Sequence, residues 1–264
     1  MHNDLFTVFG LTVHGYGLMV GTGFLLAVIL CCYRAKWLGL SPDAALDLAI
    51  LILVLGFLGG KLLYILVEFK SFLRDPLALL GSEGFVVYGG ILSGILCAIW
   101  YCRRKKLNFW SYFDLMMPGA ALNQGVGRIG CFLAGCCYGR QTNSALGVVF
   151  PQGSIAPAGI PLLPTQLFSA AGDLLIAAAL LLLHRRLSRQ GSVGALYLIL
   201  YGLGRFVIEF FRADPRGSVG VLSTSQFISV FIVLGGAFLL WRCRRMPERA
   251  DKPVVTPQGA DVRC

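Results

Sequence analysis

The chain of 264 residues alternates between long apolar runs and short polar segments. Each run has about 20 residues, which is enough for a helix to cross the hydrocarbon core of a bilayer. The pattern predicts seven transmembrane helices, at about 14–33, 44–67, 84–101, 112–136, 164–184, 194–212 and 224–242. We therefore expect an all-α integral membrane protein with a single seven-helix domain over 1–245 and a disordered cytoplasmic tail over 246–264.

Composition agrees with this pattern. The chain is 56% hydrophobic and 14% charged, with a mean hydropathy of +0.74, whereas soluble domains carry roughly 25% charged residues. The first apolar run does not read as a cleavable signal peptide, because no basic stretch precedes it and Arg34 and Lys36 follow it. The sequence therefore predicts a multi-pass integral membrane protein.

The basic residues of the loops predict the orientation. Fifteen lysines and arginines fall in 34–43, 102–111, 184–193 and the tail from 242, and only five fall in the loops of the opposite side. Since cytoplasmic loops carry the excess of Lys and Arg, the N-terminus is expected outside and the C-terminus in the cytoplasm. The net charge of +10 follows from this bias and from attraction to anionic lipid. It does not indicate a nucleic-acid partner.

The fourth run contains an arginine, Arg128, among glycines. An arginine at bilayer depth costs several kcal/mol unless it is paired or faces water. Gln124, Arg128 and Cys131 follow at i, i+4 and i+7, so they share one helix face. The alternative is a tightly packed helix whose arginine snorkels to the interface, which is difficult from the middle of a span.

The sixth run contains a second arginine. Tyr201, Arg205, Glu209 and Arg212 fall at i, i+4, i+8 and i+11, which places them on one helical stripe. An Arg205–Glu209 pair with a purely structural role is one interpretation, since buried charges must pair. The other adds an anionic ligand, because two arginines outnumber the single carboxylate and leave one positive charge over.

Further polar residues give weaker signals. Lys61 lies in the second run, where snorkelling and ligand contact are equally good readings. His14 and Tyr16 open the first run, where such residues often belong to an interfacial belt. Tyr88 in the third run and Gln166 at the start of the fifth are individually weak indications of a site.

Three of the nine cysteines, Cys131, Cys136 and Cys137, cluster near the outer end of the fourth run. Disulfides persist on that side of a membrane. Packing or local polarity is one interpretation, and a disulfide or reactive thiol is the other. The C-x4-C-C spacing matches no common metal site, so the sequence predicts neither a metal nor a cofactor.

The order of these motifs resembles the bacterial prolipoprotein diacylglyceryl transferases, over about 14–242. The specific parts are the stretch from Gly127-Arg128-Ile129-Gly130 to Gly139-Arg140 and the stretch from Arg205 to Arg212. Supporting parts are His14-x-Tyr16-Gly17, Gly59-Gly60-Lys61, Tyr88-Gly89-Gly90 and Pro164-Thr165-Gln166-Leu167. Members of that family have seven spans with the N-terminus outside, which agrees with the orientation derived from the loops.

The resemblance implies a reaction. Phosphatidylglycerol gives its diacylglyceryl group to the lipobox cysteine thiol of a prolipoprotein signal peptide, a thioether forms and glycerol phosphate leaves. Arg128, Arg205 and Glu209 are the expected catalytic residues, with the arginines on the phosphate. The expected substrate-binding residues, besides Arg128, are Gln124, Tyr16, His14, Lys61, Tyr88, Gly135, Arg140, Gln166 and Arg212. The expected partners are phosphatidylglycerol, lipobox signal peptides and membrane lipid.

The sequence departs from the family pattern at several positions. The family commonly has Asn where Cys131 stands, Glu where Cys136 stands and His where Tyr88 stands. Its fifth-span motif often reads His-Pro-Ser-Gln-Leu-Tyr-Glu, which here is Leu163-Pro164-Thr165-Gln166-Leu167-Phe168-Ser169. His and Glu candidates for the base are thus absent. Either those residues are not the base, or the chain is a divergent paralogue with another acceptor.

Two other classes remain as alternatives. An anion transporter would use the same arginines, but it is expected to show an inverted repeat or a broken-helix pair, and neither is found in the sequence. A thiol-redox membrane protein would be built on the three cysteines, but it is expected to show a C-x-x-C pair or a quinone site.

Overall fold

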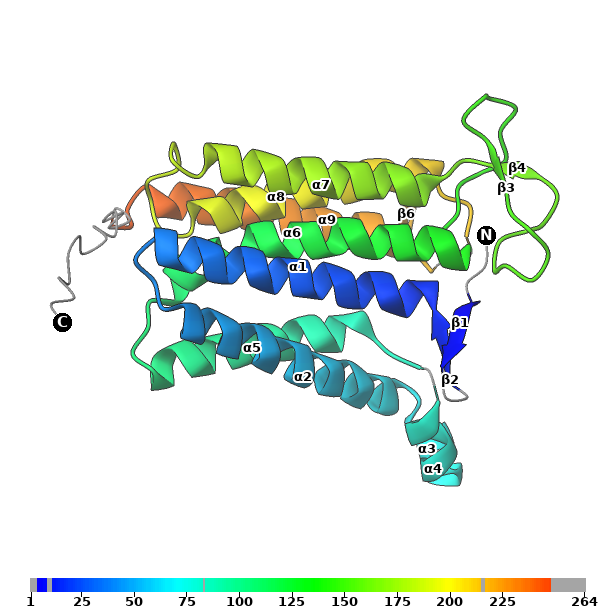
Figure 1. Ribbon diagram of the computed structural model, residues 1–264, viewed down its shortest axis with the longest axis horizontal. Helices are drawn as coiled ribbons and strands as arrows, with labels where there is room; N and C mark the ends of the chain where they lie inside the picture. Colours follow the sequence, from blue (N-terminus) through cyan, green and yellow to red (C-terminus); the bar gives the residue numbers. More distant parts are fainter. Residues whose placement is uncertain (1–3, 9–10, 83, 215–216, 248–264) are drawn as a thin grey trace, which may run out of the picture. The chain divides into compact units, whose positions relative to one another are not determined.

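The computed structural model describes residues 4–8, 11–82, 84–214 and 217–247. Seven long helices coincide with the seven apolar runs (Figure 1). They are α1 (Gly15–Trp37), α2 (Pro42–Val67), α5 (Val87–Arg104), α6 (Phe109–Ala134), α7 (Thr165–Leu183), α8 (Ser192–Ile208) and α9 (Thr224–Cys243). Every helix end lies within four residues of its predicted position. Most of the tail expected over 246–264 lies outside the described residues.

Short elements fill the connections. Two brief helices, α3 (Phe69–Arg74) and α4 (Pro76–Gly81), follow α2, and a 3-10 turn (Glu209–Phe211) follows α8. Three antiparallel strand pairs complete the structure: β1 (Asp4–Val8) with β2 (Leu11–His14), β3 (Val148–Val149) with β4 (Pro161–Leu162), and β5 (Ser218–Val219) with β6 (Leu222–Ser223). The chain is mostly helical, with minor strands that the sequence pattern does not reveal.

Five of the described helices are long and apolar enough to cross a membrane: α1, α2, α7, α9 and the segment Ser192–Phe211 that contains α8. Most of their large apolar side chains face outward, for example Leu25, Phe57 and Leu182 at 59%, 63% and 79% exposed. Such surfaces are unfavourable in water and suit the hydrocarbon of a bilayer. The chain is therefore a membrane protein.

The chain forms two compact units. Of the described residues, the first contains those up to Cys31 and those from Phe113 to 247, and the second contains Cys32–Tyr112. The second unit is built on the α2–α5 pair. Gly59 of α2 and Gly89 of α5 face each other so closely that a Cβ on Gly89 would collide with the Gly59 carbonyl. The glycines of these two motifs thus let the helix backbones touch, as small residues do in membrane helices.

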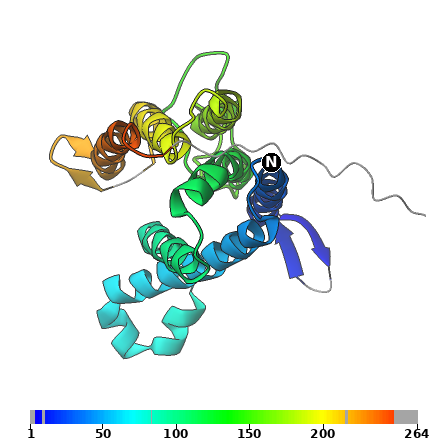
Figure 2. The same cartoon turned by 90° about the vertical axis from the view of Figure 1, so that its left-hand side faces the viewer.

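The first unit contains most of α1 and of α6 and all of α7, α8 and α9, seen nearly end-on in Figure 2. Glycines again allow close contact, since a Cβ on Gly202 of α8 would lie 3.2 Å from the Ser229 carbonyl oxygen of α9. At one end of the unit, the buried carboxylate of Asp114 accepts hydrogen bonds from the backbone N–H groups of Gly191 and Gly194, both 2.8 Å. These bonds satisfy N–H groups at the start of α8.

The opposite end of the first unit, where α6 ends and α7 begins, is called the loop end below. It contains residues 135–164 with β3 and β4 (Figure 1). The chain after α6 pairs with the chain after α8: Arg140 N–H donates to the Phe211 carbonyl at 2.9 Å, and Ala213 N–H donates to the Tyr138 carbonyl at 3.3 Å. A small cluster of Phe150, Ala156 and Leu162 closes the loop.

These pairings change one sequence expectation. The stripe from Tyr201 to Arg212 was expected on one continuous helix, but α8 ends at Ile208 and the 3-10 turn carries Glu209. Arg212 is extended, with φ −82° and ψ 152°. The extended backbone of Arg212 pairs with Gly139, so its side chain leaves the stripe. The stripe therefore ends at Glu209.

Candidate functional site

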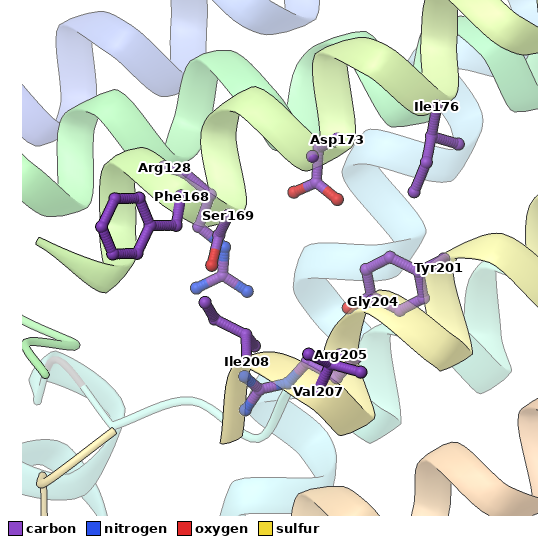
Figure 3. Close-up of a pocket in the computed structure, with 11 residues that line it drawn as sticks. Arg128, Phe168, Ser169, Asp173, Ile176, Tyr201, Gly204, Arg205, Val207 and Ile208 are labelled. Atoms are coloured by element: carbon purple, nitrogen blue, oxygen red, sulfur yellow. The ribbon is translucent and has the colours of Figure 1, made fainter. Parts of the chain in front are cut away.

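A cavity of about 210 Å³ lies among α6, α7 and α8 of the first unit (Figure 3). Its lining combines two arginines, one carboxyl group and two hydroxyl groups with apolar side chains. The lining residues are Arg128, Phe168, Ser169, Gly172, Asp173, Ile176, Tyr201, Gly204, Arg205, Val207 and Ile208. The two arginines that the sequence singles out in its apolar runs therefore face the same space.

Arg128 enters the cavity from α6. Within the described part of the chain, its guanidinium makes no hydrogen bond or ion pair, and its surroundings act on it only through longer-range electrostatic interactions. Close packing holds the helix in place here, because a Cβ on Gly130 would lie 3.1 Å from the Tyr16 carbonyl oxygen of α1. A guanidinium with five donors directed at a cavity is a ready partner for an anion.

Arg205 enters from α8 and is held in place. Its Nη2 lies 3.0 Å from Glu209 Oε2 and donates to the Ser225 hydroxyl of α9 at 2.8 Å. Glu209 Oε2 has no hydrogen bond of good geometry, so the contact between Arg205 and Glu209 is an ion pair by distance rather than an aligned bond. The attraction between the two charges is the main interaction of this pair, because the Glu209 side chain is only 6% exposed and water screens it little. Glu209 orients Arg205 and does not itself line the cavity.

Asp173 of α7 is a cavity residue that the sequence analysis missed. It is 8% exposed, and its carboxyl group points into the space that Arg128 and Tyr201 also face (Figure 3). It interacts electrostatically with both arginines. The prediction from the sequence counted two arginines and one carboxylate, that of Glu209. With Asp173 there are two arginines and two carboxylates, so the prediction of one surplus positive charge was wrong. The signal was present in the sequence, since Asp173 is the one ionisable residue in α7 and an ionisable residue in a span suggests a functional site.

Gln124 lies one turn from Arg128 on α6, as the spacing predicts. Its side-chain oxygen accepts a hydrogen bond from the Tyr197 hydroxyl at 2.8 Å, which links α6 to α8. Tyr197 also stacks on Tyr201, with ring centroids 5.7 Å apart. Gln124 thus supports the wall behind the cavity rather than lining it.

Beyond α6 the chain reverses in a tight turn. Gly135 has φ +73° and Cys137 has φ +62°, both in the left-handed region, which favours glycine. The start of α7 fixes this turn: Gln166 Nε2 donates to the Cys136 carbonyl at 2.7 Å, and the Thr165 hydroxyl donates to the Cys137 carbonyl at 2.8 Å. Gly135 and Gln166, expected at the site, therefore shape the loop end.

The thiols of Cys131, Cys136 and Cys137 meet at this turn, with sulfur atoms within 4.8 Å of one another. None of the eight cysteines among the described residues forms a disulfide. Hydrogen bonds from the other two thiols, together with the nearby Arg212, hold the pKa of Cys137 well below its usual range. Arg212 makes two hydrogen bonds of 2.8 Å to the Asp214 carboxylate.

The remaining expected residues lie in different places. Tyr16 is half exposed at the start of α1 and interacts electrostatically with the three thiols and with Arg128. His14 and Arg140 are exposed at the loop end, where Arg140 lies 5.6 Å from the Phe211 ring. Lys61 and Tyr88 belong to the second unit. The structure thus groups Tyr16, Arg128, Arg205 and Glu209 in the first unit and gives no placement of Lys61 and Tyr88 relative to them.

The cavity has the chemistry of an anion site with a limited volume. Ligand pockets for drug-sized molecules have roughly 300–1,000 Å³, so about 210 Å³ accommodates a headgroup rather than a whole lipid. Two of its lining side chains, Phe168 and Val207, are 38% and 54% exposed. An amphiphile can therefore place its anionic part between the arginines while its apolar part stays along this exposed surface.

Comparison with known proteins is consistent with this chemistry. Residues 3–242 match the family model described as prolipoprotein diacylglyceryl transferase. The chain is 44% identical over 246 residues to phosphatidylglycerol–prolipoprotein diacylglyceryl transferase 2 of Clostridium perfringens, covering 92% of this chain and 96% of that protein. It is 47% identical over 237 residues to phosphatidylglycerol–prolipoprotein diacylglyceryl transferase of Clostridium tetani, covering 89% and 95%. A Finegoldia magna protein with the same name as the latter is 28% identical over 255 residues, covering 96% and 100%.

Proposed function

Because the chain belongs to the prolipoprotein diacylglyceryl transferase family, we propose that its Arg128–Arg205 cavity binds the phosphate of phosphatidylglycerol. The chain is an enzyme of lipoprotein maturation. It transfers the diacylglyceryl group of phosphatidylglycerol to the lipobox cysteine thiol of a prolipoprotein and forms a thioether.

One observation carries the assignment: Arg128 and Arg205 face a single cavity, and Arg128 makes no hydrogen bond or ion pair within the described residues. Burying an arginine without a partner is costly. A phosphate between the two guanidiniums supplies the missing partner through short charge-assisted hydrogen bonds. Glu209 and Ser225 hold Arg205 in the orientation that meets the phosphate.

The arginines act most strongly when the glyceryl carbon–oxygen bond breaks. The thiolate sulfur attacks the glyceryl carbon, the electron pair of that bond moves to the phosphate oxygen, and glycerol phosphate leaves with one more negative charge. Donors fixed beside the developing charge stabilise it without having to reorganise. Apolar side chains such as Phe168 and Ile208 restrict water around the phosphate and strengthen these contacts.

We further propose that all seven long helices span the bacterial inner membrane, with the loop end of the first unit outside. The lysine and arginine bias of the loops supports this orientation. A periplasm-active reporter fused after Arg212 and a cytoplasm-active reporter fused after Arg189 should both give signal. Silence from either fusion contradicts the arrangement.

The test of the function is complementation. A strain depleted of its own transferase should regain lipoprotein maturation when this chain is expressed, as a mobility shift of a lipobox-containing protein. A chain that inserts normally but does not restore the shift would instead favour a paralogue with another acceptor.

A further inference from the structure

Three thiols meet at the loop end although their spacing resembles no common metal motif. Cys131 is buried in the last turn of α6, and Cys136 and Cys137 follow in the half-buried turn. Their sulfur atoms all lie within 4.8 Å of one another. Among the described residues, no other set of three or more His, Cys, Asp or Glu side chains is grouped closely enough to hold a metal ion.

Local structure builds this cluster and fixes it in place. The left-handed residues Gly135 and Cys137 fold the chain back on α6, and the Cys136 N–H donates to the Cys131 carbonyl at 3.1 Å. Gln166 and Thr165 then hold the carbonyls of Cys136 and Cys137 from α7. The backbone carbonyls are therefore engaged, while the three side chains converge.

The geometry suits zinc. Zinc–sulfur bonds are about 2.3 Å long, which places the sulfurs of a tetrahedral site about 3.8 Å apart. Sulfurs within 4.8 Å reach that spacing by small side-chain rotations. Three protein ligands with one position open for water or substrate is the arrangement of catalytic zinc, whereas structural zinc has four protein ligands.

We propose that Cys131, Cys136 and Cys137 bind one Zn²⁺ ion, whose fourth position takes the lipobox thiol of the incoming prolipoprotein as a thiolate. This inference rests on the proposed function, since it names the group that activates the acceptor. It also addresses the absence of His and Glu at the positions where the family pattern has them. A metal ion deprotonates a thiol that it coordinates, so a base at those positions is not needed.

The surrounding charges support a thiolate-rich centre. Zinc with three thiolates carries one negative charge, and a fourth thiolate adds another. Arg212 contacts Cys137, and Arg128 interacts electrostatically with Cys131 and Cys137. Arg128 also lies one helical turn from Cys131, so the zinc site and the phosphate cavity are neighbours on α6.

The proposed step transfers the thiolate sulfur to the glyceryl carbon and the electron pair to glycerol phosphate. The lipobox thiol binds zinc at the turn of Cys136 and Cys137, which are only partly buried, and releases its proton to solvent. The zinc-bound thiolate forms the new sulfur–carbon bond with the glyceryl carbon as the carbon–oxygen bond breaks. The electron pair leaves on glycerol phosphate, beside Arg128 and Arg205. The thioether product is a weak ligand and leaves the zinc, which keeps its charge and its three cysteines.

Metal binding is tested on the full chain in detergent, stripped with a chelator and then loaded with Zn²⁺. The expected content is one zinc per chain, reduced at least tenfold in Cys131→Ser, Cys136→Ser and Cys137→Ser. The matched control Cys97→Ser, a buried cysteine of the second unit, should keep its zinc. Loading with Co²⁺ should give a sulfur-to-cobalt charge-transfer band in the wild type and in Cys97→Ser, but not in the variants of Cys131, Cys136 and Cys137.

Two results would overturn the site. One is an equal zinc content in the wild type and in the three cluster variants, and the other is a disulfide between two of the three cysteines.

Transfer to a lipobox peptide is measured on the same samples. Stripping should slow transfer roughly a hundredfold, and Zn²⁺ should restore it. Cys136→His, which keeps a zinc ligand, should retain zinc and part of the activity. The double variant Cys131→Asn, Cys136→Glu installs the family pattern and should be zinc-free and insensitive to the chelator. Full activity of the stripped wild type would overturn the thiol-activating role and leave the proposed function standing. Zinc bound by the cysteines with no transfer under any condition would instead contradict the proposed function, and the thiol-activating role with it.

Discussion

Lys61 and Arg128 are both basic residues within apolar helices, and the structure treats them in opposite ways. In the second unit, Lys61 Nζ donates to the Ser82 carbonyl at 2.6 Å, to the Ser82 hydroxyl at 3.4 Å and to the Gly84 carbonyl at 3.4 Å. It also lies 5.3 Å from the ring centroid of Tyr64. In the first unit, Arg128 has no such bonds to described residues and faces a cavity.

The contrast separates a structural cation from a ligand-binding one. An ammonium group has three donors, and all three donor contacts of Lys61 go to the segment that follows α4. That segment is thereby attached to α2, and little capacity remains for a substrate. Arg128 donates to no described residue, so its five donors remain for an anion that enters the cavity. The number of donors already engaged, rather than depth in the membrane, distinguishes the two roles.

The largest expected effect is at Arg128. Arg128→Ala should slow transfer by two to three orders of magnitude, because one well-placed donor to a developing charge contributes about 2–4 kcal/mol. Arg128→Lys should also transfer slowly, because the compact ammonium of lysine does not reproduce the planar, bidentate hydrogen bonding of a guanidinium. The measurement is the rate of lipobox-peptide modification at matched amounts of inserted protein. A near-native transfer rate for Arg128→Ala would show that Arg128 is only a structural counter-ion and does not bind the phosphate.

Arg205→Ala should have a similar effect if both arginines hold one phosphate. The double variant with Arg128→Ala should then be no slower than either single variant, because residues that act as a unit are strongly non-additive. The same transfer assay is applied to the wild type, the two single variants and the double variant, which together form a double-mutant cycle. Effects that simply add would indicate two independent anion sites.

Lys61→Met should act on stability rather than on chemistry. Loss of the ammonium leaves two carbonyl groups without their donor and is expected to cost about 1–3 kcal/mol of unfolding free energy. The thermal unfolding midpoint in detergent should fall, while transfer per folded molecule changes less than threefold. Lys61→Arg, which keeps donors at this position, is the control and should lose less stability. A large loss of turnover at native stability would move Lys61 into the substrate site.

Asp173→Asn is expected to have the smallest effect. The Asp173 carboxyl group faces the same space as the arginines, so it competes with a lipid phosphate for them. Removing its charge should lower the apparent KM for phosphatidylglycerol several-fold, since like charges near one site repel. The readout is the KM in mixed micelles of fixed composition, with Asp173→Glu, which keeps the charge, as the control. A raised KM would instead assign Asp173 a direct role in holding the headgroup.

Most of the fold could be predicted because long apolar runs are a simple physical signal for long helices. Apolar length gives all seven long helices with their ends within four residues. The break after Ile208 could not be predicted, because it depends on pairing between Arg212 and Gly139, which are remote in sequence. The glycines of Gly59-Gly60 and Gly89-Gly90 could be recognised as motifs, but their mutual contact required the structure.

The site could be predicted in part. Arg128 and Arg205 stand out because charge is rare in spans, and their common cavity agrees with that prediction. Asp173 carries the same signal and was missed because it belongs to no recognised motif. The meeting of Cys131 with Cys136 and Cys137 depends on the left-handed turn at Gly135, which residue spacing does not reveal.

The most direct test of the phosphate site is equilibrium binding of phosphatidylglycerol to the wild type and to Arg128→Ala in nanodiscs. Diacylglycerol, which lacks the phosphate, serves as the matched ligand. Phosphatidylglycerol should bind the variant roughly a hundredfold more weakly, because the charge-assisted bonds to the phosphate are lost. Diacylglycerol should bind both proteins equally. Equal affinity of the two proteins for phosphatidylglycerol would contradict the assignment of Arg128 to the phosphate.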